Sequence, residues 1–193
     1  MSNTISDFKS GFNGGTRANR FSVDITWPTG LSTTLPATTT YHIVAAKLPE
    51  AELGSISIPY RGRVAHYAGD RDYRPWSITV LDDINPGTGT NKNASWLAFQ
   101  SWSNLLSSHI NNKPKDQTYA EGNTLKTLTF NQLRDPSFGT SGSPTSGYYR
   151  KINLFHAWPS EVGQIGLDMG EGGSLVAFTV TFSYDYYNIL SVP

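Results

Sequence analysis

The chain of 193 residues contains no cysteine and unusually few charged side chains. Without cysteine it can form neither disulfides nor thiolate metal sites, which fits a reducing cytosol without proving it. Charged residues make up 16% of the sequence, whereas ~25% is usual in soluble proteins. The formal net charge is +0, so the charge balance provides no electrostatic footprint for gripping nucleic acid.

The sequence also lacks segments that target a protein to a membrane. Its first residues, MSNTISDFKSGF, contain no apolar core of a signal peptide, and no run approaches the ~20 apolar residues of a membrane span. We therefore expect a protein that is neither secreted by a standard signal nor embedded in a membrane. A free monomer with so little charge is prone to association, so contacts between subunits are expected to cover much of its surface.

The motifs of common enzyme and cofactor sites are missing as well. G-x-S-x-G, G-x-G-x-x-G and the P-loop do not occur. The histidines are scattered, without metal-ligand spacing: His42, His66, His109 and His156. The carboxylate pairs Asp70/Asp72 and Asp82/Asp83 lie at expected strand ends, where aspartate is an ordinary turn residue. We predict no catalytic residues, no metal and no cofactor.

The clearest structural signal is the alternating stretch SLVAFTVTFSYDY at residues 174–186. Apolar and aromatic residues occupy every second position, which predicts one β-strand with an apolar face and a hydroxyl-rich face. At ~3.3 Å per residue this strand is about 40 Å long. It contains no lysine, proline or glycine to discourage pairing, so we expect neighbours on both edges, from another chain if necessary.

Similar alternation predicts further strands, divided by turn residues. The expected strands are 21–27, 41–48, two pieces around a turn at 59–62, then 76–81, 125–133, 148–156 and 162–169. A second turn is predicted at Gly69-Asp70. The spacing of Trp96, Phe99 and Trp102 predicts one amphipathic α-helix over about 93–110, capped by Asn93. The fold class is mainly β: an antiparallel β-barrel or sandwich of roughly eight strands with that single helix.

We expect one domain that spans residues 1–193. Within it, residues 1–20 form a polar N-terminal arm or short helix. Residues 53–72 form an extended hairpin or loop. Residues 134–147, rich in serine, glycine and proline, form a flexible loop between two strands.

Two long segments resemble the tail tube proteins of contractile-tailed bacteriophages. They are VAAKLPEAELGSISIPYRGRVAHYAGDRDYRPWSITVLDD, residues 44–83, and FHAWPSEVGQIGLDMGEGGSLVAFTVTFSYDYY, residues 155–187. The stretch FKSGFNGGTRANRFSVDI near the start is similar to that family's N-terminus. A-G-D-R before a tryptophan-bearing strand and A-W-P-x-x-V-G before the terminal strand are fairly specific. Together these segments cover around half of the chain, in the order found in the family.

The resemblance implies a structural virion protein whose hexameric rings stack into the inner tube of a contractile tail. Such a tube is the conduit for genome delivery. The partners implied are other copies of the chain, the sheath protein, and baseplate and tail-terminator proteins. The tape-measure protein and DNA pass through the lumen without specific binding, and no membrane is involved. The protein is expected in the phage tail, after assembly in the host cytoplasm.

Within this reading, the segment 53–72 is the expected contact between rings. Arginines lie at its turn, and carboxylates lie at the opposite end of the strand. One such surface ion pair is worth only ~0–1 kcal/mol, but every subunit of a ring repeats it. The expected inter-ring residues are Tyr60, Arg61, Arg63, Asp70, Arg71 and Asp72. A second expected contact is the N-terminal arm, through Arg17 and Arg20.

Three alternatives stay open. A baseplate protein that initiates the tube, or a terminator that ends it, shares the fold, although the absence of an extra domain favours a plain tube subunit. An inner-tube protein of type VI secretion or of a contractile bacteriocin is a more distant relative. A β-sandwich carbohydrate-binding module is also rich in strands and aromatics, but it normally carries a secretory signal.

Overall fold

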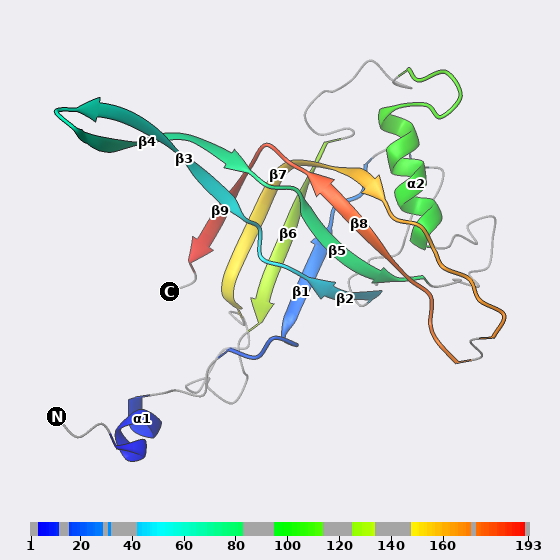
Figure 1. Cartoon of the computed structure of the whole chain (residues 1–193). Coiled ribbons are helices and arrows are strands. Elements are labelled where there is room, and N and C mark those ends of the chain that lie inside the picture. The colour runs from blue at the N-terminus through cyan, green and yellow to red at the C-terminus, as the bar shows by residue number, and fades with distance from the viewer. Residues whose placement is uncertain are drawn as a thin grey trace.

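The computed structural model describes residues 4–11, 16–28, 31, 42–82, 95–113, 125–133, 148–170 and 173–191. The elements, in chain order, are α1 (Ile5–Gly11), β1 (Phe21–Ile25), β2 (Ile43–Ala46), β3 (Ala51–Tyr60), β4 (Arg63–Tyr73), β5 (Trp76–Leu81), α2 (Ser95–Leu106), β6 (Lys126–Leu133), β7 (Tyr148–Val162), β8 (Ala177–Ser183) and β9 (Tyr186–Ser191). Figure 1 shows a twisted sheet, α2 beside it, and the β3–β4 hairpin extending away from it. Neither described helix is long and apolar enough to cross a membrane.

The main sheet has the strand order β1-β6-β7-β8-β5-β2, and β9 pairs with β7. Its pairs are all antiparallel. The strand β7 is the longest, at 15 residues. Its first part, up to Phe155, pairs with β9 as well as with β6, whereas its last part, from Trp158 to Val162, pairs with β8. The predicted antiparallel β-rich class is confirmed, but the described strands form an open sheet rather than a closed barrel.

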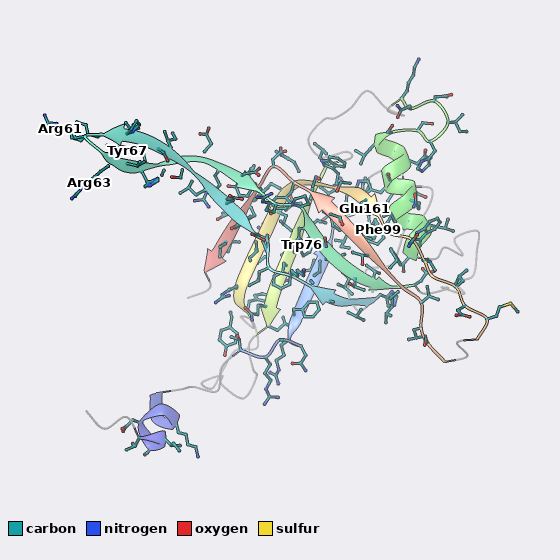
Figure 2. All side chains as sticks on the ribbon, in the orientation of Figure 1. Arg61, Arg63, Tyr67, Trp76, Phe99 and Glu161 are labelled. Atoms are coloured by element: carbon teal, nitrogen blue, oxygen red, sulfur yellow. The ribbon has the colours of Figure 1, made fainter. Side chains whose placement is uncertain are left out.

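The core lies between the sheet and α2, and it follows the alternation seen in the sequence. Phe178, Val180 and Phe182 of β8 are buried. From α2, the ring of Phe99 lies 6.0 Å from that of Phe178 and 6.1 Å from that of Phe182. Trp76 of β5 is buried within the sheet body (Figure 2). Apolar burial on this scale is the main driving force of folding, and it fixes the platform from which the hairpin extends.

The long terminal strand predicted for residues 174–186 is wrong in its extent. The chain forms β8 as far as Ser183, changes direction at Tyr184 and Asp185, and continues as β9. Two contacts hold the corner: the amide of Asp185 donates to the carbonyl of Phe155 at 3.2 Å, and Oδ2 of Asp185 lies 2.6 Å from Nδ1 of His156. The predicted alternation of buried and exposed side chains continues into the corner between β8 and β9, because Tyr184 is buried like Phe178 and Phe182 before it.

Two further strand predictions need correction. Residues 162–169 do not form a strand, because only Val162 belongs to β7 and the chain then leaves the sheet. The Gly69-Asp70 turn is instead part of the continuous strand β4. The register shifts there, opposite Leu53 and Ser55. An extra residue in one strand of a pair produces such a bulge, which twists the strand without ending it.

The predicted helix exists but is shorter than 93–110. It ends at Leu106, and Ile110, assigned to its apolar face, is 91% exposed. Asn93, its predicted cap, lies outside the described residues. Oδ1 of Asp82, at the end of β5, accepts a hydrogen bond from the amide of Trp96 at 3.2 Å. The predicted loop 134–147 also lies outside the described residues.

Candidate assembly surface

The β3–β4 hairpin is a two-stranded ribbon that leaves the body of the protein (Figure 1). Its strands pair only with each other among the described strands. At ~3.3 Å per residue the ribbon is about 30 Å long, and almost every residue in it is exposed. An isolated hairpin of two strands is only marginally stable in water. The ribbon is therefore suited to being covered by another chain.

The two faces of the ribbon differ in polarity. Cross-strand pairing sets Ile56 opposite Tyr67 and Ile58 opposite Ala65, so one face is apolar, and these larger side chains are about half exposed. On the other face, Nδ1 of His66 lies 3.4 Å from the hydroxyl of Ser55. Exposed apolar side chains gathered on one face commonly mark a protein contact. The apolar face is therefore the side expected to meet a partner.

The tip of the ribbon combines an aromatic ring with two cations. Tyr60 is paired with Arg63, and the two residues between them, Arg61 and Gly62, have φ angles of 46° and 78°. Positive φ at both central residues defines the tight type I′ turn. The guanidinium carbon of Arg61 lies 5.4 Å from the centroid of the Tyr60 ring. Arg61 and Arg63 lie at the outer end of the ribbon (Figure 2).

A cluster of tyrosines anchors the base of the ribbon to the corner between β8 and β9. The ring of Tyr73 lies 6.0 Å from that of Tyr184 and 5.4 Å from that of Tyr187. The hydroxyl of Tyr184 donates to the carbonyl of Glu50 at 3.4 Å. Burial, with smaller effects of the two neighbouring tyrosines and Glu50, raises the pKa of Tyr184 to about 12. These contacts fix the direction in which the ribbon leaves the body.

A salt bridge also braces this base. The guanidinium of Arg74 donates to the carboxylate of Glu52 across the two strands, and the Arg74 amide donates to the carbonyl of Glu50 at 3.2 Å. Both charged side chains are more than half exposed, so this pair contributes little stability by itself. Its main effect is to hold the start of β3 against the end of β4.

The residues predicted to make inter-ring contacts occupy two separate places. Tyr60, Arg61 and Arg63 lie at the tip, whereas Asp70–Asp72 lie near the base of β4. The two groups are about 25 Å apart along the strand at ~3.3 Å per residue. No ion pair joins them within the described part of the chain. The predicted contact between them therefore requires two different subunits.

The predicted arm residues Arg17 and Arg20 lie directly before β1. The backbone here is tied to the sheet, because the amide of Leu133 donates to the carbonyl of Arg20 at 3.0 Å. Arg17 is exposed, and Arg20 is partly buried. Further toward the N-terminus, residues Ile5–Gly11 form the short helix α1, one of the two forms expected for this segment.

The connection between β7 and β8 is a second exposed surface, which the sequence analysis missed. Leu167 is 83% exposed, Leu175 is 77% exposed, and Met169 is fully exposed. The sequence predicted a strand at residues 162–169, in which every second side chain would be buried. The closely spaced glycines Gly163, Gly166 and Gly170 are the signal that favours a loop.

Within the described ranges, the titratable side chains do not assemble into a recognisable chemical site. Among the described residues, no three histidine or acidic side chains are grouped to hold a metal ion. Asp82 is engaged at the start of α2, and His156 pairs with Asp185 at the β8–β9 corner. His156 has a φ of 55°, uncommon for a residue other than glycine. These groups therefore hold the sheet together at places where the chain changes direction.

Comparison with known proteins agrees with a role in assembly. Residues 16–190 match the phage tail tube protein family. The tail tube protein of Enterobacteria phage T4 is 23% identical over 189 residues, which cover 95% of this chain and 98% of that protein. A chain in the baseplate of the anti-feeding prophage has a TM-score of 0.58 at 13% identity, covering 93% of this chain and 98% of the other. A chain of the PVC sheath–tube complex, an extracellular contractile injection system, has a TM-score of 0.55 at 14% identity, covering 99% and 100%.

The two solved structures share the fold of this chain along nearly its whole length. The family match covers far more than half of the sequence, including the hairpin and both exposed surfaces. The resemblance seen in the sequence is therefore confirmed: this chain belongs to the phage tail tube protein family and is a structural component of contractile phage tails.

Proposed function

We propose that this chain forms six-membered rings, by analogy with the 6-fold symmetrised baseplate that contains a similar chain. The rings stack into the inner tube of the tail, through which the genome is delivered. The observation that carries the proposal is the β3–β4 ribbon, which extends from the sheet with its apolar face uncovered. In a free monomer the apolar face of this ribbon stays in contact with water, whereas an assembly buries it.

Open sheet edges support ring formation. Among the described strands, β1 pairs only with β6, β2 only with β5, and β9 only with β7. The edge strand β9 also exposes Ile189 and Leu190. Unpaired edges invite pairing with another chain, and a ring of identical subunits covers the same edge in every copy. Ring closure thus removes the edges that the open sheet leaves in one subunit.

The tip of the ribbon is placed to join one ring to the next. Tyr60, Arg61 and Arg63 contact a neighbouring ring, with Asp70–Asp72 near the hairpin base as the complementary charges. Each surface pair is worth ~0–1 kcal/mol, but all subunits of the ring contribute at once. The arm with Arg17 and Arg20 is a secondary contact.

The proposed role includes the rest of the tail machinery. The tube lies inside the sheath protein and meets baseplate and tail-terminator proteins at its ends, after assembly in the host cytoplasm. The tape-measure protein and DNA pass through its lumen without specific binding, which suits a chain with zero net charge. The whole of residues 1–193 acts as one domain, and the protein has no catalytic role.

A second candidate role is that of a tube initiator or terminator, since a similar chain occurs in a baseplate. Sedimentation velocity of the purified protein over a range of concentrations separates the roles. A tube subunit is expected to sediment as rings and as longer polymers that grow with concentration. Rings that never grow would favour an initiator or terminator, and a monomer that persists at high concentration would contradict both roles.

A further inference from the structure

The two exposed apolar surfaces lie at opposite ends of the molecule. In Figure 1 the β3–β4 hairpin extends to the upper left, and the connection between β7 and β8 extends to the lower right. We call residues 163–170 and 173–176 of this connection the β7–β8 loop. Because of this separation, the hairpin tip of a subunit cannot reach the β7–β8 loop of the same subunit. A contact between them requires two copies.

Their apolar side chains are of comparable size and are exposed in both places. The tip presents Ile58 and Tyr60 on the apolar face of the ribbon, and the loop presents Leu167, Met169 and Leu175. Met169 is the most exposed of the large hydrophobic side chains in the described part of the chain. Burying such groups against each other removes apolar area from water, which favours association.

Their charges are opposite. Between Ser55 and Tyr67 the hairpin carries Arg61 and Arg63 and no carboxylate. In the sequence from Gly163 to Val176 there are two carboxylates, Asp168 and Glu171, and no lysine or arginine. Complementary potentials fix the orientation of a contact and reject wrong pairings. Two hairpin tips, or two loops, would instead bring like charges together.

We infer that the hairpin tip of one copy docks on the β7–β8 loop of a second copy, with Ile58 and Tyr60 against the exposed apolar loop residues and the two arginines near Asp168. The inference rests on the proposed stacking of rings, and it replaces Asp70–Asp72 with Asp168 as the carboxylate that receives the tip. An interface between two different patches of the same chain is heterologous. Such an interface builds closed rings or open stacks, as a tube requires.

The absence of cysteine allows a direct test by cross-linking. Ile58→Cys and Met169→Cys place one thiol on each surface of an otherwise cysteine-free chain. Tubes assembled from a mixture of the two single variants are treated with a short bis-maleimide, and dimers are counted on a denaturing gel. The control replaces Met169→Cys with Ile110→Cys, a side chain that is equally solvent-exposed but lies beyond α2. We expect cross-linked dimers with Met169→Cys and their loss with Ile110→Cys.

A charge test uses variants that preserve the local backbone. Asn favours the positive φ of residue 61, so Arg61→Asn with Arg63→Gln removes the charges without straining the turn. Oδ1 of Asp168 accepts from the amide of Gly170 at 2.8 Å, and Asp168→Asn retains this acceptor. Each variant is expected to shorten tubes several-fold, whereas combining Arg63→Asp with Asp168→Arg restores their length.

The outcomes separate the two proposals. If the wild-type protein forms tubes and the variants cross-link between residues 58 and 169, the inference is supported. If wild-type tubes form but the variants do not cross-link at these positions, or if Asp72→Cys captures Ile58→Cys instead, the inference is overturned and the proposed function stands. A wild-type protein that forms neither rings nor tubes contradicts the proposed function itself.

Discussion

The amide of Gly163 donates a hydrogen bond to the carbonyl of Thr179 at 2.7 Å, at the point where the chain leaves β7. A Cβ atom added to Gly163 would lie 2.7 Å from the same oxygen. The carbonyl of Gly163 in turn accepts from Nε1 of Trp96 at 3.1 Å. This glycine, the last residue of the A-W-P-x-x-V-G stretch, therefore joins the sheet to helix α2.

Gly163→Ala is expected to lower the free energy of unfolding by about 2 kcal/mol, because the added methyl forces a backbone shift in a packed region. Thermal unfolding followed by circular dichroism measures the loss, a fall in Tm of several degrees. Gly166→Ala is the matched control, since a Cβ there meets no described atom within 4 Å. Equal stability of the two variants would show that the close approach at Thr179 does not matter.

Tyr184 gives a prediction about alkaline pH. Its pKa is raised from the ordinary 10.0 to about 12 in the folded protein, so the folded state favours the neutral phenol. The resulting stability is fully present below pH 10 and is lost as pH rises from 10 toward 12. A pH titration followed by the near-ultraviolet absorbance of the phenolate should show a tyrosine that ionises at about pH 12. This ionisation should be absent in Tyr184→Phe. A variant with an unchanged titration curve would rule out the assignment.

Reversing both tip charges, Arg61→Glu with Arg63→Glu, should leave folding and ring closure intact and shorten or abolish tubes. The tip is exposed and far from the core, so circular dichroism should be unchanged. Electron microscopy counts the stacked rings. Tubes of normal length and stability would show that the hairpin does not join rings, and the arm with Arg17 and Arg20 would become the expected contact.

Duplex DNA should not bind measurably at physiological salt. Binding gains free energy mainly by releasing counterions from phosphates, and this requires clustered cations. The chain has 15 lysines and arginines against 15 acidic residues. Fluorescence anisotropy of labelled duplex DNA measures the affinity of the protein for DNA. A micromolar affinity that falls steeply with salt would contradict a lumen through which DNA passes freely.

Local patterns predicted most of the strands because burial on one face requires alternation. Trp76–Leu81 alternates between buried and partly buried residues as expected, and the turn at Arg61-Gly62 follows from local chemistry. Tyr60, Arg61 and Arg63 lie at the tip of the hairpin and Asp70–Asp72 lie near its base; that these residues join rings stays a prediction.

What the sequence missed depends on non-local pairing. The alternation continues through Tyr184 and Asp185, so it gives no sign that the chain turns to pair with the first part of β7. The predicted strand ended at His156, yet β7 continues through Pro159 to Val162. The sequence did not reveal the exposed β7–β8 loop, because Ile165, Leu167 and Met169 occupy every second position, as the apolar residues of a strand do.

The most direct test of the proposed assembly is electron microscopy of the purified wild-type chain. We predict hollow tubes of stacked rings, with end-on averages that show six subunits around a central channel. Fields of uniform monomers at high protein concentration, or rings with a different symmetry, would contradict this account.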